Sequence, residues 1–168
     1  MSEEKLHPLV PPDYLPLSAE IAVARDDDSE EGRAKKYLIH KHAHATLNHY
    51  IATQNHVAAF MLAFSLLEDR IRAMYVVLVR DIDKRIVQED ELKQSISKVF
   101  HLFYTRNEIT KEQNSQLFKL FTLRNKLVHN TMWHLHIFRA ADVASVKNMH
   151  RQITNLTEKM KRRAKKLS

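Results

Sequence analysis

Two residues late in the chain have side chains suited to chemistry at a phosphate group. Arg124 and His129 are separated by four residues, and Asn125 directly follows the arginine. Arginine offers phosphate oxygens a planar, charged fork of donors, whereas histidine titrates near neutrality and can transfer protons. Cleaving RNA without a metal requires a base for the 2′-hydroxyl, an acid for the leaving 5′-oxygen and cations for the phosphorus oxygens. The pair supplies such groups, and Asn125 is suited to hold a phosphate oxygen or to orient the imidazole.

These residues fall within a segment whose apolar pattern predicts a helix. Thr110 and Gln113 have the spacing of a capping box, which marks the start of the helix. Apolar residues then recur on one helical face, at Leu117, Leu120, Phe121, Leu127 and Val128. Arg124 shares this face, so its side chain is directed toward the core. Burying an unpaired guanidinium costs several kcal/mol, so Arg124 is expected to meet a carboxylate or to receive a phosphate.

The spacing of Arg124 and His129 limits how the two side chains can meet. Residues five apart on an ideal α-helix point in directions about 140° apart. Both reach one phosphate only if the helix ends near Val128 or if two subunits share the site. The sequence therefore favours a homodimer in which two copies of this segment face each other. Trp133 and Leu135, just beyond it, either cover this interface or fold back on their own core.

An earlier segment carries the strongest helical pattern and places a carboxylate where it could support the arginine. Its apolar residues recur at spacings of three and four, as on the contact face of a bundle helix: Val57, Phe60, Phe64, Leu67, Ile71, Met74 and Leu78. Glu68 lies beside this face. It is either the partner of Arg124 on a neighbouring helix or an ordinary surface glutamate.

The remaining segments complete an all-α fold. Helices are expected over residues 33–51, 89–103 and 142–160, whereas residues 132–139 alternate in polarity and favour extended or irregular structure. In the helix over 89–103, one side carries Leu92, Ile96, Val99, Phe100 and Phe103. Because the connections are short, the sequence predicts an antiparallel up-and-down bundle of four to five helices over residues 33–168. Residues 1–32 hold all four prolines and an acidic run, and are expected to form a disordered tail.

Charge is divided unevenly along the chain. Residues 1–31 hold nine acidic and two basic residues, whereas the remainder holds 25 basic and 11 acidic residues. A body this basic favours a polyphosphate partner such as RNA. The residues expected to contact the RNA backbone are Lys126, Lys159, Lys161, Arg162 and Arg163. The chain has no cysteine and no uninterrupted apolar span, so we expect a cytoplasmic protein that does not cross a membrane.

Histidines in the first predicted helix raise the question of a metal site. His40 and His44 are one turn apart, with His42 and His49 nearby. This cluster is either a zinc site or a solvated helix face, and the latter is favoured because no cysteine or carboxylate accompanies it. His134 and His136 are interpreted in the same way. No metal and no cofactor are predicted, and a chain with one glycine has no glycine-rich phosphate loop.

The stretch Arg124-Asn125-Lys126-Leu127-Val128-His129, on an apolar helix late in an all-helical chain, resembles the ribonuclease motif of the HEPN superfamily. That motif is an arginine, four to six residues and a histidine, often with a polar residue after the arginine. The resemblance covers roughly residues 55–160. It implies a metal-independent endoribonuclease acting as a dimer, with Glu68 as the acidic residue that supports Arg124.

The same resemblance implies a toxin or defence role, with an antitoxin or other regulatory partner. One position departs from the family. In HEPN toxins silenced by a nucleotidyltransferase, a tyrosine two residues after the histidine is modified, and this chain has Thr131 there. Two other hypotheses remain at this stage: a catalytically silent HEPN-like module that binds nucleic acid or protein, and an unrelated helical regulator. In these, Arg124 and Glu68 fix the core and His129 caps the helix.

Overall fold

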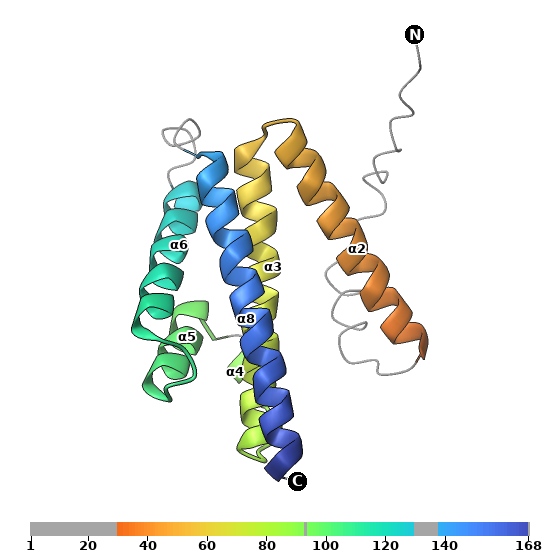
Figure 1. Ribbon diagram of the computed structural model, residues 1–168, viewed down its shortest axis with the longest axis vertical. Coiled ribbons are helices and arrows are strands. Elements are labelled where there is room, and N and C mark those ends of the chain that lie inside the picture. The colour runs from red at the N-terminus through yellow and green to blue at the C-terminus, as the bar shows by residue number, and fades with distance from the viewer. Residues whose placement is uncertain (1–29, 93, 130–137, 168) are drawn as a thin grey trace. The chain divides into compact units, whose positions relative to one another are not determined.

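The computed structural model describes the backbone of residues 30–92, 94–129 and 138–167, and every regular element among them is a helix (Figure 1). The predicted all-α fold is therefore confirmed. The chain divides into two compact units, residues 1–46 and 47–168. Helix α2 (Glu30–Ala52) crosses their boundary. The predicted tail lies outside the described residues except for positions 30–32, which are already helical.

Helix α3 (His56–Val76) contributes much of the core of the second unit. Asn55 precedes it as N-cap, and its side-chain oxygen accepts a hydrogen bond from the backbone N–H of Ala58 at 3.1 Å. Most of the predicted apolar face is buried: Phe60, Phe64, Leu67, Ile71, Met74 and Leu78. The helix continues into a π-helical turn, η2 (Val77–Ile82). No helix in the described part of the chain is long and apolar enough to span a bilayer.

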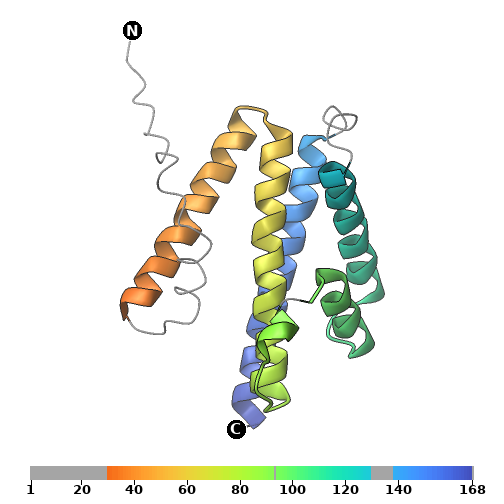
Figure 2. The same cartoon turned by 180° about the vertical axis from the view of Figure 1, so that it is seen from behind.

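Helix α8 (Ala140–Leu167) lies along α3 and runs in the same direction (Figures 1 and 2). The rings of Phe60 and Phe138 have centroids 4.9 Å apart near the start of both helices. Toward the other end, the charge of Arg70 acts on Glu158. The helix begins where the carboxylate of Asp142 accepts a hydrogen bond from the backbone N–H of Arg139 at 2.9 Å. An up-and-down order of five helices would make α3 and α8 antiparallel, whereas an order of four makes them parallel, and the structure has them parallel.

After η2 the chain reverses its direction. The sequence assigned this reversal to a long helix over residues 89–103, but a short, mostly irregular segment makes it. Helix α4 (Glu89–Leu92) has a single turn, and α5 (Ile96–Thr105) begins only after Ser95, whose extended backbone interrupts the helix. Arg72 of α3 donates to the backbone carbonyl of Leu92 and, at 3.4 Å, to that of Gln94. The chain thus returns alongside α3 before α5 starts. The predicted helix over 89–103 is wrong in this respect, and Leu92 is 37% exposed.

Helix α6 (Lys111–His129) begins at the predicted capping box. The backbone N–H of Gln113 donates to Thr110 Oγ1 at 3.2 Å, and the backbone N–H of Thr110 donates to Gln113 Oε1 at 2.9 Å. Gln113 Nε2 also donates to Gln152 Oε1 of α8 at 3.0 Å. Arg163, near the end of α8, pairs at 2.6 Å with Glu108, just before α6. These contacts make α6 antiparallel to α8.

Candidate functional site

Arg124 is half-buried on α6, close to the buried face of the helix. Leu117, Leu120 and Leu127 are buried there, as predicted. The Arg124 guanidinium donates from Nη1 to Asn125 Oδ1 at 3.2 Å. The two residues singled out from the sequence are thus in direct contact, and the arginine side chain is drawn toward the side of the helix that carries Asn125.

Val128 was expected on the buried face, but it is 43% exposed. The ring of Phe121 on α6 meets the ring of Phe100 on α5, with centroids 6.1 Å apart. Helix α5 begins at Ile96, only about one turn beyond that contact. The last turn of α6 therefore extends past α5, which leaves Val128 without apolar cover from that helix.

Glu68 is half-buried on α3, within range of the charge of Arg124. Its pKa is raised above the ordinary value of 4.5, first because burial disfavours the carboxylate. The positive charges of Arg124 and Arg72 act in the opposite direction, and Asp69 adds to the rise. The structure therefore places Glu68 near Arg124, as the sequence suggested, while the hydrogen bond of Arg124 is made to Asn125.

His129 is the last residue of α6 and its side chain is exposed. Because the helix includes both Val128 and His129, it does not end early enough to bring the imidazole to Arg124 within one chain. Asn125, however, lies one helical turn before His129 and therefore on nearly the same face. Its hydrogen bond to Arg124 links the arginine to the histidine face. This edge of the helix therefore carries a guanidinium donor, an amide and an imidazole ring.

The residues expected to bind RNA fall at two separate places. Lys126 is exposed close to His129, whereas Lys159, Lys161, Arg162 and Arg163 are exposed near the end of α8. Arg163 pairs with Glu108 beside the start of α6, so His129 is farther away by roughly the length of that helix, about 27 Å. Lys161 pairs with Glu158 at 2.8 Å. The α8 cluster is therefore remote from the motif, although sequence reasoning grouped it with Lys126.

The histidine cluster gives no metal site in the part of the chain that the structure describes. His42 is exposed and His44 half-buried, and the described residues contain no group of three histidine, cysteine or acidic side chains able to hold a metal ion. The side chain of His40 lies outside the described residues. So do Thr131, Trp133, His134, Leu135 and His136, so the expectations for the dimer interface and for residues 132–137 remain predictions.

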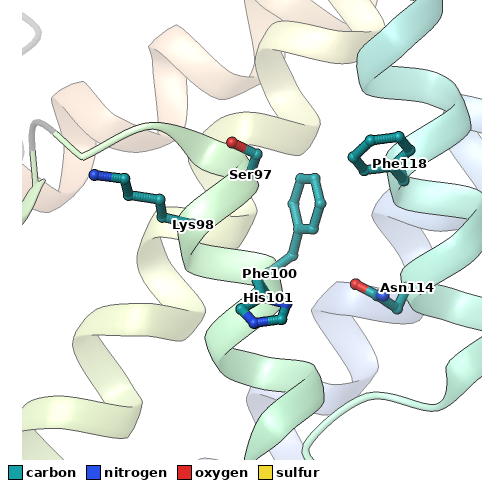
Figure 3. A pocket seen from close by; sticks show the side chains of 6 residues that line it. All are labelled: Ser97, Lys98, Phe100, His101, Asn114 and Phe118. Carbon is teal, nitrogen blue, oxygen red and sulfur yellow. The ribbon is translucent and has the colours of Figure 1, made fainter.

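The structure has a cavity between α5 and α6 that was not predicted from the sequence. It has a volume of about 440 Å³ and is lined by Ser97, Lys98, Phe100, His101, Asn114 and Phe118 (Figure 3). Phe118 is 58% exposed, far more than the other phenylalanines of α5 and α6. A signal was present in the sequence, because Phe118 is out of phase with the apolar face of α6.

Comparison of the chain with models of protein families, with curated proteins and with solved structures found no match.

Proposed function

We propose that this protein is a metal-independent endoribonuclease of the HEPN type, with Arg124, Asn125 and His129 as its working residues. The observation that carries the proposal is the hydrogen bond from Arg124 to Asn125, one turn before the exposed His129. It holds a guanidinium suited to phosphate oxygens beside the face of α6 that carries an imidazole able to transfer protons.

In the proposed reaction, one imidazole removes the proton of a 2′-hydroxyl, and that oxygen attacks the adjacent phosphorus. The bond from phosphorus to the 5′-oxygen breaks, and a second imidazole protonates the departing oxygen. The products are a 2′,3′-cyclic phosphate and a 5′-hydroxyl, so water and redox partners are not consumed. Arg124 compensates the charge on the phosphorus oxygens, and Asn125 positions the guanidinium.

Two His129 imidazoles at one phosphate require two copies of the chain. Since α6 remains helical through His129, Arg124 and His129 of one chain diverge, and a two-fold axis would place two of each around one groove. The proposal therefore includes a homodimer. A toxin or defence role with a regulatory partner belongs to the same proposal through the HEPN resemblance, and we place this action in the cytoplasm.

The test is cleavage of mixed RNA by the purified protein in excess chelator. The wild-type chain is expected to cut, and His129→Ala is expected to lose about 10²- to 10⁴-fold in rate, the contribution of a positioned acid or base. His42→Ala is the matched control, since it removes an exposed histidine from α2. Cleavage that needs a divalent ion, or that survives in His129→Ala, would refute the proposal.

The second candidate is a catalytically silent helical module that binds RNA or a protein. The divergence of Arg124 and His129 on a continuous helix favours it, because a single chain cannot apply both side chains to one phosphate. This module would bind RNA without cutting it, and His129→Ala would change neither property.

A further inference from the structure

The cavity between α5 and α6 combines an exposed aromatic ring with polar side chains. Phe118 of α6 leaves 58% of its surface in water, and Phe100 of α5, which is almost fully buried, forms the wall opposite (Figure 3). Below the two rings, the amide of Asn114 points toward α5, where His101 lies. The volume of about 440 Å³ falls within the range of small-ligand sites, roughly 300–1,000 Å³.

These side chains match the chemistry of an unpaired nucleobase. An exposed aromatic ring provides a stacking platform that accepts any base, since every base has a π-face. Asn114 supplies an amide donor and acceptor, and His101 supplies a ring that can donate or accept, so both suit the polar edge of a base. Lys98 is exposed on the outer side of α5 and extends away from the rings, where a flanking phosphate would run.

The cavity also lies in line with the motif. Phe118, Thr122, Asn125 and His129 are spaced by four, three and four residues, so they follow one side of α6. Phe118 and His129 are about 16 Å apart along the helix axis. A strand that leaves the cavity along this side would reach the residues assigned to cleavage.

We infer that the groove between α5 and α6 binds an unstacked base of single-stranded RNA, with Phe118 as the stacking platform. The inference rests on the proposed function only for the choice of RNA as the polymer. It specifies that the RNA substrate is single-stranded near the cleavage site, because a base within a duplex cannot stack on Phe118.

Binding is measured in a His129→Ala background, so the result does not depend on cleavage. The probe is a single-stranded RNA of about 12 nucleotides, within the range of single-strand site sizes. Phe118→Ala is expected to weaken binding by about 5- to 150-fold, the worth of one stacked base. Phe118→Tyr is expected to restore it. Ile86→Ala is the matched control, since Ile86 is 78% exposed and lies outside the cavity.

Two further binding measurements identify what the Phe118 ring contacts. With a strand of the same length that lacks bases, the difference in affinity between Phe118→Ala and its parent should vanish, because only the phosphates remain to be bound. With a duplex of the same sequence, the difference should also vanish. Because Phe118 is largely exposed, Phe118→Ala is expected to fold, and its melting temperature is recorded alongside.

Equal affinity of Phe118→Ala and its parent for the single strand would overturn the inference. So would a loss that is the same for the base-free strand, or a Phe118→Ala variant that loses self-association in sedimentation instead of RNA affinity. The last result would assign the groove to a second copy of the chain. A protein that binds through Phe118 but never cuts RNA would refute only the proposed ribonuclease.

Discussion

Asn125→Ala tests the contact on which the ribonuclease proposal depends. The change removes the acceptor of the Arg124 hydrogen bond and leaves both the guanidinium and His129 in place. A hydrogen bond to a charged group contributes about 1.5 to 3 kcal/mol. The observed bond is 3.2 Å long, at the upper end of the usual range, and both side chains are half-buried. The lower figure is therefore appropriate, and it corresponds to about a tenfold loss in kcat/KM.

The assay follows cleavage of a fluorescently labelled single-stranded RNA in excess chelator, with thermal melting of each variant recorded in parallel. Asn125→Ala is expected to lose about tenfold in kcat/KM, far less than His129→Ala, because Arg124 still carries its charge. Ser115→Ala, at an exposed position earlier on α6, is the control. Unchanged kcat/KM in Asn125→Ala would refute the role assigned to this contact. A loss matched by a large drop in melting temperature would assign Asn125 to folding instead.

Three further predictions concern Glu68, the start of α6 and the association of two chains. Because burial raises the pKa of Glu68, the folded state holds its proton more tightly than the unfolded state, and this stabilisation is lost as pH rises through the folded-state pKa. The free energy of unfolding of the wild type should therefore fall relative to that of Glu68→Gln as pH rises from 4.5 to neutrality; parallel curves would contradict the burial argument. Thr110→Ala removes one half of the capping box and should cost about 1 kcal/mol in urea denaturation, with a fall of about 2–8 °C in melting temperature; no change would show that α6 does not depend on its cap. The sedimentation coefficient and the specific activity should fall together on dilution, since two chains share the proposed site. A monomer with full specific activity would refute the shared site.

Local and periodic features of the fold could be predicted from the sequence. The capping box of Thr110 and Gln113 depends on two residues three apart, and both of its hydrogen bonds are present. The buried face of α3 depends on a long apolar repeat, which few other structures accommodate. The direction of α8 could not be predicted in the same way. It depends on how the chain returns from η2 to α5, and that return is held by long-range contacts of Arg72 with backbone carbonyls.

In the candidate site, too, local features could be predicted from the sequence and long-range ones could not. The helical position of Arg124 followed from the apolar period of α6, but its hydrogen bond to Asn125 depends on the conformation of a long side chain. The sequence also could not show that the basic residues of α8 lie at the far end of α6 from His129. That separation depends on the antiparallel packing of the two helices. Phe118 was visible as an apolar residue out of phase, but its meaning required the position of α5.

The RNA ends that the protein leaves in excess chelator show whether it is a metal-independent ribonuclease. If Arg124, Asn125 and His129 form a metal-independent ribonuclease site, mass spectrometry of the products should show 2′,3′-cyclic phosphates and 5′-hydroxyls with the wild-type chain, and intact RNA with His129→Ala. Products with 3′-hydroxyl and 5′-phosphate ends, or the same cyclic ends from His129→Ala, would rule out this metal-independent mechanism.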